Sequence, residues 1–157
     1  MGKLLSANFY QSMDKLVPRY PTRVALLLPA FHAAQDEHGW LSPAILHEVA
    51  DYIGIHPAQA REVASFYNMY HLEPVGRHFL RLCTNVSCSL RGADDLVAHC
   101  KKKYGVAAGE TTQDGKITFI EEECLGACGT APAAMLNNDY HENLNVDGLD
   151  VLLNGLR

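Results

Sequence analysis

The chain has 157 residues, of which 48 % are hydrophobic and 20 % are charged, the composition of a folded globular protein. Its net charge of −5 argues against a nucleic-acid binder, which normally presents a basic face. The longest apolar run, Val24 to Ala34, is interrupted by Pro29 and His32 and is far shorter than a membrane span. Because the N-terminus carries no signal-peptide pattern, we expect a cytoplasmic protein that is not inserted in a membrane.

The first half of the chain contains no cysteine and shows the apolar spacing of helices. Residues 24–35 fit one helix, in which Pro29 predicts a kink or a break. Residues 42–54 predict a second helix, with Ser and Pro at its start and Gly at its end. A third helix is expected over residues 57–67. Three short helices with short connections indicate a small bundle.

A turn-forming segment at residues 73–76 marks a change of pattern, so we predict a helical domain over residues 1–75 and a second domain over residues 76–157. The second domain is expected to contain, in order, a strand at 78–83, a helix at 93–104, a loop at 105–115, strands at 116–123, 133–136 and 140–144, and a last helix from Asp147 to Leu156. This order is compatible with a small α/β sandwich, in which helices flank one sheet.

The five cysteines are many for a cytosolic chain of this size, and their odd number does not suit a disulfide framework. Cys83 and Cys88 form a C-x4-C pair, and Cys124 and Cys128 form a C-x3-C pair. Each pair is expected where a strand gives way to a loop, with Cys88 just before a helix. A [2Fe–2S] cluster needs four such thiolates in a small volume, but paired cysteines also bind structural zinc. Spacing alone leaves both occupants open.

The residues around the cysteines have simpler interpretations. Cys100 shares an apolar helix face and is expected to be a core residue rather than a ligand. Gly126 and Gly129 would let the backbone approach a bulky cluster. The acidic run 121–123 is expected to be a solvated strand end. Nearby histidines such as His99 could replace a thiolate, as in Rieske centres, but four well-placed cysteines make that unnecessary.

Two cysteine motifs together resemble a known family. CTNVSCSLRGA at residues 83–93 and ECLGACGTAP at residues 123–132 are similar to the thioredoxin-like [2Fe–2S] subunit of the NADH-oxidising module of respiratory complex I. LPAFHAAQDEHGWL at residues 28–41 and EVASFY at residues 62–67 are similar to the N-terminal bundle of the same family. The resemblance extends over residues 12 to 156.

The resemblance implies an α/β (α+β) protein, with a small helical bundle followed by a thioredoxin-like [2Fe–2S] ferredoxin domain. It implies one [2Fe–2S] cluster on Cys83, Cys88, Cys124 and Cys128, with Pro132 close by. The partner would be a flavoprotein subunit that binds FMN and NADH and carries its own [4Fe–4S] cluster. The chain would pass single electrons as a non-catalytic subunit at the cytoplasmic face of a bacterial inner membrane.

Two further functions stay open at this stage. The same family supplies the small diaphorase subunit of NAD-linked hydrogenases and formate dehydrogenases. A zinc-stabilised structural adaptor is the alternative from a different class. A thioredoxin-type dithiol enzyme would need C-x-x-C, and a dinucleotide-binding site of its own would show G-x-G-x-x-G; the chain contains neither motif.

Overall fold

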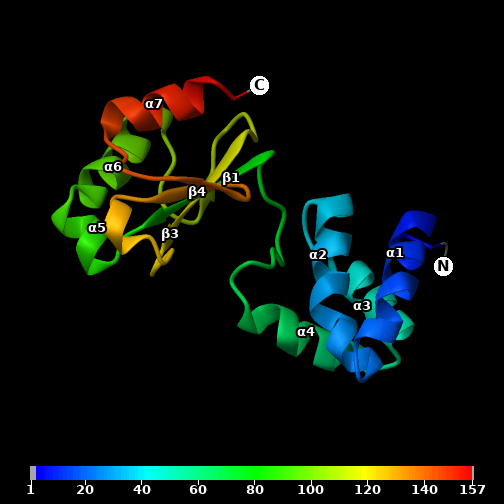
Figure 1. Ribbon diagram of the computed structural model, residues 1–157. Coiled ribbons are helices and arrows are strands. Elements are labelled where there is room, and N and C mark those ends of the chain that lie inside the picture. The colour runs from blue at the N-terminus through cyan, green and yellow to red at the C-terminus, as the bar shows by residue number, and fades with distance from the viewer. Residues whose placement is uncertain (1–2, 157) are drawn as a thin grey trace. The chain divides into compact units, whose positions relative to one another are not determined.

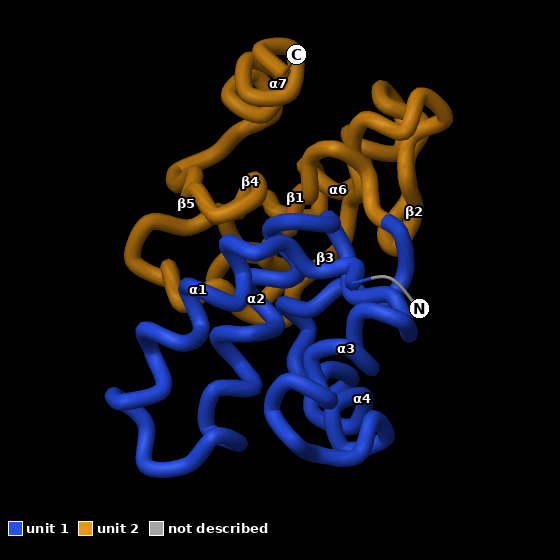
Figure 2. Tube along the Cα trace, turned by 90° about the vertical axis from the view of Figure 1, so that its right-hand side faces the viewer, with its two compact units in different colours: residues 1–74 blue, residues 75–157 orange. Residues whose placement is uncertain are grey.

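The computed structural model describes residues 3–156 (Figure 1). Within these residues the chain forms two compact units, which meet in sequence between Pro74 and Val75 (Figure 2). The first unit is helical, and the second contains a five-stranded sheet with helices. The mixed α/β fold class expected from the sequence is therefore confirmed.

Over residues 3–74 the helical unit contains four α-helices rather than the three expected. They are α1 (Ala7–Leu16), α2 (Leu27–His38), α3 (Pro43–Ile53) and α4 (Pro57–Phe66), with short 3-10 turns at Val17–Arg19 and Arg23–Leu26. The prediction lacked α1. Its start is fixed by Ser6, whose hydroxyl accepts a hydrogen bond from the Phe9 N–H at 3.1 Å. Phe9 and Met13, one turn apart, are the buried residues that dock it.

The expected break at Pro29 is wrong, because α2 begins only two residues earlier, at Leu27. A proline in the first helical turn costs no hydrogen bond, since the N–H groups there have no intrahelical acceptor. The predicted boundaries of α3 are confirmed: the Ser42 hydroxyl caps its start, and Gly54 ends it in a left-handed conformation with φ of 86°.

One apolar core holds this unit together. Its fully buried members come from all four helices and from the segments just before and just after α2; they include Phe9, Leu26, Ala30, Phe31, Ala34, Leu41, Val49, Ala50 and Ala60. Phe31 meets Tyr70 edge to face, with ring centroids 5.2 Å apart, and the Tyr70 hydroxyl donates to the Leu28 carbonyl. Residues after α4 are thus tied back to α2, and the unit closes on itself.

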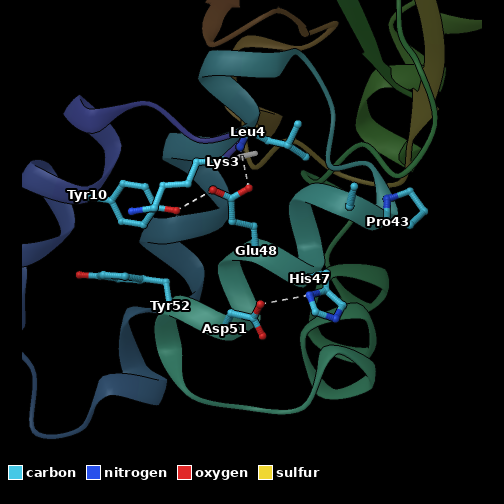
Figure 3. Close-up of a pocket in the computed structure, with 9 residues that line it drawn as sticks. Lys3, Leu4, Tyr10, Pro43, His47, Glu48, Asp51 and Tyr52 are labelled. Atoms are coloured by element: carbon cyan, nitrogen blue, oxygen red, sulfur yellow. Dashed lines mark hydrogen bonds and ion pairs between the residues drawn. The ribbon is translucent and has the colours of Figure 1, made fainter. Parts of the chain in front are cut away.

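A carboxylate on α3 fastens the start of the chain to the bundle (Figure 3). The Glu48 side chain accepts hydrogen bonds from the Leu4 N–H at 2.8 Å, the Leu5 N–H at 3.2 Å and the Tyr10 hydroxyl at 2.6 Å. It borders a surface hollow of about 770 Å³ lined by Lys3, Leu4, Tyr10, Pro43, Ala44, His47, Glu48, Asp51 and Tyr52. Because the carboxylate is occupied by donors of its own chain, it serves the fold of this unit.

The second unit is built on a mixed sheet with strand order β2-β3-β1-β4-β5. The strands are β1 (His78–Cys83), β2 (Glu110–Thr111), β3 (Ile117–Glu122), β4 (Ala134–Leu136) and β5 (Asp139–His141). The pair β1–β3 is parallel, and the other three pairs are antiparallel. Residues 105–115 were expected to be loop throughout; the two-residue β2 lies within them. The last strand begins and ends earlier than the expected 140–144.

Two helices pack on one face of this sheet. They are α6 (Ala93–His99), which continues as a π-helical turn over Cys100–Tyr104, and α7 (Val146–Asn154). Their buried leucines join alternate strand residues in a single core containing Leu80, Leu82, Leu96, Cys100, Val106, Ile117, Phe119, Ala134, Leu136, Leu149 and Leu153. The helix α7 begins at Val146, one residue before the expected Asp147, and Asn145 caps it: the Asn145 side-chain oxygen accepts the Gly148 N–H at 2.8 Å.

Asp150 joins α7 to the end of α6 in a polar cluster. Its carboxylate lies 2.8 Å from His99 Nε2 and accepts from Lys103 Nζ at 2.6 Å and from the Tyr104 hydroxyl at 2.7 Å. These hydrogen bonds, of which that from Lys103 has the largest effect, hold the pKa of the Asp150 carboxyl well below its usual range.

Within the described part of the chain, no helix has both the length and the apolar character that a membrane span needs.

Candidate metal centre

The two cysteine segments meet because β1 and β3 are parallel neighbours. Their register places Cys83 beside Glu122, so both strands end at the same edge of the sheet. The Thr84 N–H donates to the Glu122 carbonyl at 3.0 Å, and the Asn85 side-chain amide donates to the Glu123 carbonyl at 2.9 Å. These two hydrogen bonds join the loop after β1 to the loop after β3, the two loops in which the sequence predicts the cysteine pairs.

The first pair of cysteines is buried. Cys83 ends β1, and Cys88 lies inside a short helix, α5 (Val86–Leu90), rather than just before a helix as expected. Their exposed fractions are 3 % and 1 %, and both pack with Ala93 and Ala131 in a small apolar cluster. This side of the site is closed to solvent.

The second pair is exposed. Cys124 follows β3, and Cys128 begins a 3-10 turn over Cys128–Thr130. Between them Gly126 has φ of 75°, a conformation that favours glycine, and its N–H donates to the Cys124 sulfur at 3.3 Å. A Cβ at Gly129 would meet no atom of the chain within 4 Å, so the backbone beside Cys128 is open.

The pKa values of the two buried thiols depend on the neighbouring cysteines. Burial opposes ionisation of Cys83, but hydrogen bonds from the backbone N–H groups of Asn85 and Leu125 and from the thiols of Cys88 and Cys124 lower its pKa overall. The pKa of Cys88 is raised, and the largest cause is the burial of its thiol.

The other effects on Cys88 come from the same group of thiols. A hydrogen bond from the Ala133 backbone N–H opposes this rise in pKa. A hydrogen bond with the Cys83 thiol and the charges of Cys83 and Cys128 add to it. Each exposed cysteine thus acts on one of the buried thiols, Cys124 on Cys83 and Cys128 on Cys88.

The fifth cysteine stands apart from this group. Cys100 is completely buried in the core between α6, α7 and the sheet. Burial raises the pKa of its thiol to about 11, with the charge of Asp150 adding to the rise. The adjacent His99 is engaged by Asp150. The interpretation of Cys100 as a core residue agrees with this placement.

One expectation about the surroundings is wrong. The sequence predicts a solvated strand end that includes Glu122, but this residue is only 8 % exposed, whereas Glu121 and Glu123 are exposed. Alternate side chains of a strand point to opposite faces, so the three acidic residues do not share one environment.

Two residues outside the cysteine pairs also hold the second loop, and spacing does not single them out. The Arg91 guanidinium donates through Nε to the Ala131 carbonyl at 2.6 Å. The Tyr140 hydroxyl donates to the Leu125 carbonyl at 2.9 Å. Arg91 lies inside the first cysteine motif, so its position in the sequence points to the site. Tyr140 lies outside both motifs, and no sequence pattern indicates its contact with the loop. The Ala131–Pro132 peptide bond is cis.

The donor set fits a [2Fe–2S] cluster. It offers four thiols on two loops with backbone N–H groups directed at the sulfurs, and such a cluster takes two thiolates on each iron. Among residues 3–156, no group of three or more His, Cys, Asp or Glu side chains is gathered closely enough to hold a single metal ion.

The fold and this donor set fit an iron–sulfur protein of the ferredoxin class. A family model described as thioredoxin-like [2Fe-2S] ferredoxin matches residues 13–157. The chain belongs to this family, and its cofactor is one [2Fe–2S] cluster. The resemblance recognised from the two cysteine motifs is therefore confirmed.

Relatives with assigned roles agree with the family. The chain is 43 % identical to a protein of Rhizobium meliloti that is named as a subunit of NADH-quinone oxidoreductase, over 94 % of this chain and 88 % of that protein. It is 41 % identical to the mitochondrial NADH dehydrogenase [ubiquinone] flavoprotein 2 of Dictyostelium discoideum, over 84 % of this chain. In that second case it spans 55 % of the relative's length.

A solved structure shares the fold. The crystal structure of an NAD+-reducing [NiFe]-hydrogenase in the air-oxidized state superimposes with a TM-score of 0.73 at 25 % sequence identity. The match covers 82 % of this chain and 22 % of the hydrogenase chain.

Proposed function

We propose that the chain is the electron-transfer subunit of the NADH-oxidising module of an NADH-quinone oxidoreductase, with Cys83, Cys88, Cys124 and Cys128 as the ligands of its [2Fe–2S] cluster. The observation that carries the ligand assignment is the meeting of two cysteine pairs at the edge where the parallel strands β1 and β3 end. The chain is a subunit of an oxidoreductase, and we expect it to hold no substrate site of its own.

The residues of the chain have distinct roles in this function. The four thiolates hold the cluster, which when bound accepts and releases one electron at a time. Backbone N–H groups of Asn85, Leu125, Gly126 and Ala133 donate to the sulfurs and stabilise their negative charge. Burial excludes water on the side of the first pair, while the exposed second pair gives the cluster an accessible side.

The partner that fits this role is a flavoprotein subunit that binds FMN and NADH and carries a [4Fe–4S] cluster. NADH delivers two electrons as a hydride, and flavin can pass them on singly, which is the form that a [2Fe–2S] centre accepts. The chain would reach the membrane only through the larger complex. Purified alone, it should show no NADH oxidation, and turnover with a dye acceptor should require the flavoprotein.

The alternatives are less well supported. A zinc-stabilised adaptor would leave the family membership without its cofactor. A diaphorase subunit of a hydrogenase or formate dehydrogenase shares the fold, as the hydrogenase structure illustrates. The relatives that match most of the chain at 37 to 43 % identity are, by their names, subunits of NADH-quinone oxidoreductases, and they do not favour that alternative.

The decisive experiment is a metal and sulfide analysis of the purified chain. We expect two irons and two acid-labile sulfides per chain, a reddish-brown colour and visible absorption that bleaches with dithionite. A colourless protein holding one zinc, without iron or labile sulfide, would contradict the proposal. Co-purification with the native neighbouring subunits then tests the partner: a flavoprotein with FMN supports it, and a hydrogenase large subunit contradicts the complex I assignment.

A further inference from the structure

One peptide plane in the second cysteine loop is held from both ends. The N–H of the Leu125–Gly126 peptide belongs to Gly126 and donates to the Cys124 sulfur at 3.3 Å. The carbonyl of the same peptide belongs to Leu125 and accepts the Tyr140 hydroxyl at 2.9 Å. The chain of contacts therefore runs from the Tyr140 hydroxyl, through one peptide unit, to a proposed ligand sulfur.

We propose that Tyr140 is a positioning residue that aims the Leu125–Gly126 peptide at the Cys124 sulfur and thereby raises the reduction potential of the cluster. This inference rests on the function proposed above, because it needs Cys124 to be a cluster ligand.

The peptide needs an external anchor because of its own sequence. Gly126 adopts φ of 75°, and glycine has the widest backbone freedom of any residue, so its N–H direction is weakly fixed by local preference. Tyr140 supplies the anchor from a different element. It lies on β5 and pairs with Met135 of β4, so its position is set by the sheet and not by the loop.

The Tyr140 side chain has no competing role in the core. Its residue is 53 % exposed and does not belong to the buried cluster of this unit. A half-exposed tyrosine whose hydroxyl reaches a loop carbonyl is therefore placed for that contact, and removing the hydroxyl leaves the packing intact.

The direction of the effect follows from charge. Reduction adds negative charge, part of which resides on the ligand sulfurs, so an N–H donated to a sulfur stabilises the reduced state more than the oxidised one. A hydrogen bond to the carbonyl polarises the same peptide and strengthens its N–H as a donor. The same loop also donates the Leu125 N–H to Cys83, so a shift of the loop would weaken two such contacts.

The test is a potentiometric titration of the full chain with its cluster, followed by electron paramagnetic resonance. Tyr140→Phe removes only the hydroxyl. We expect the ratio of reduced to oxidised cluster at a fixed ambient potential to fall roughly threefold, and at most about tenfold, which is ~59 mV toward negative values for a one-electron couple. A potential equal to that of the wild type would overturn the inference.

The matched control is Tyr104→Phe. The Tyr104 hydroxyl belongs to the same unit but donates to Asp150 of α7, on the side of the helices rather than to a cysteine loop. We expect this variant to lower stability while leaving the potential unchanged. If Tyr104→Phe moved the potential as much as Tyr140→Phe, the effect would come from general loosening of the unit, and the inference would be wrong.

A vibrational measurement reports on the N–H···S contact itself. In D2O the Fe–S stretching bands of the wild type should shift, and Tyr140→Phe should reduce this sensitivity. A variant that lost the cluster altogether would make Tyr140 a structural residue and would contradict the tuning role. If the wild type itself held zinc instead of iron and sulfide, the proposed function would fail as well, whereas an intact cluster with an unshifted potential would refute only the role of Tyr140.

Discussion

The four proposed ligands differ in their surroundings, and this difference bears on how each can be replaced. Cys83 and Cys88 are buried, whereas Cys124 and Cys128 are exposed on a loop. Cys124→Ser changes one sulfur to oxygen without opening a core cavity. We expect loss of the cluster or a strongly altered visible spectrum, with far-ultraviolet circular dichroism close to that of the wild type. An unchanged spectrum and iron content would contradict the ligand assignment.

Cys100 provides the matched comparison for that variant. It is completely buried but lies in the sheet–helix core, away from the paired cysteines. Cys100→Ala removes a buried sulfur, so we expect about 1–2 kcal/mol less stability toward urea. The visible spectrum and iron content should be unchanged. Bleaching by this substitution would mean that the fifth cysteine takes part in the site.

At the scale of elements, Gly76 shows how closely the start of the second unit approaches β3. A Cβ at this position would lie 3.0 Å from the Ile117 carbonyl carbon and 3.0 Å from the Thr118 nitrogen, both backbone atoms. Its N–H also donates to the Thr118 hydroxyl at 2.6 Å. We expect Gly76→Ala to destabilise the protein by about 1–3 kcal/mol, measured by urea unfolding.

The control for this substitution is Gly155→Ala. At Gly155 the nearest atom to an added Cβ is the Val151 carbonyl oxygen at 3.4 Å, and φ is −74°. An alanine should therefore fit, and stability should change by no more than about 0.5 kcal/mol. Equal effects of the two substitutions would show that the close approach of the backbone at Gly76 is not the cause.

The contact between α6 and α7 predicts a pH dependence. The pKa of Asp150 is below its ordinary value of 3.8 in the folded chain, so its carboxylate contributes stability that is fully present above that value. This contribution is lost as the pH falls through the folded-state pKa. We expect Asp150→Asn to lower stability at pH 7 and to weaken the loss of stability below about pH 4, as measured by urea unfolding at several pH values. Parallel curves for the two proteins would contradict this role.

Local chemistry made most elements predictable. Residues 43–53 form a helix with a serine cap, a proline start and a glycine end, and residues 78–83 alternate as a strand; both agree with the structure. The missed α1 has only two buried residues, so its apolar stripe is narrow. The missed β2 has two exposed residues and exists because β3 offers it an edge. Such pairing depends on tertiary structure, which propensity does not contain.

For the proposed site, spacing singled out the four cysteines, and Cys83 and Cys124 lie at or just after the ends of β1 and β3, as expected. It did not reveal which pair is buried, because the cover comes from Ala93 and Ala131, whose packing depends on the fold. It also missed Tyr140, which reaches Leu125 from a separate strand. Residues that act on a ligand through one intervening peptide leave no signature in the spacing of the ligands.

Among the described residues, each of the two units has a large apolar core of its own. One contains Phe31 and the helices up to α4, and the other contains Phe119 with α6 and α7. Phe31→Ala should lower the free energy of unfolding of the helical unit by about 3–5 kcal/mol, because Phe31 is fully buried. We expect its far-ultraviolet unfolding transition to come at lower urea, while the visible absorption of the cluster is lost at an unchanged concentration.

The exposed Phe66 is the control for that experiment. It is 80 % exposed on α4, so Phe66→Ala should leave both transitions within about 0.5 kcal/mol of the wild type. If Phe31→Ala shifted the visible and far-ultraviolet transitions together, the two cores would unfold as one cooperative unit.

The parallel pairing of β1 with β3 has a consequence for how the protein must mature. Cys83 and Cys124 are 41 positions apart in sequence, so with the proposed ligands a bound cluster is a covalent cross-link that closes a long loop. In the chain-entropy treatment of loop closure, a cross-link of that span raises the free energy of the unfolded chain by about 4 kcal/mol and so stabilises the folded one. We expect the sheet to bring the two thiol pairs together before the cluster is inserted, and the bound cluster then to stabilise the pairing of β1 with β3. The redox centre would then also stabilise the fold of the unit that holds it.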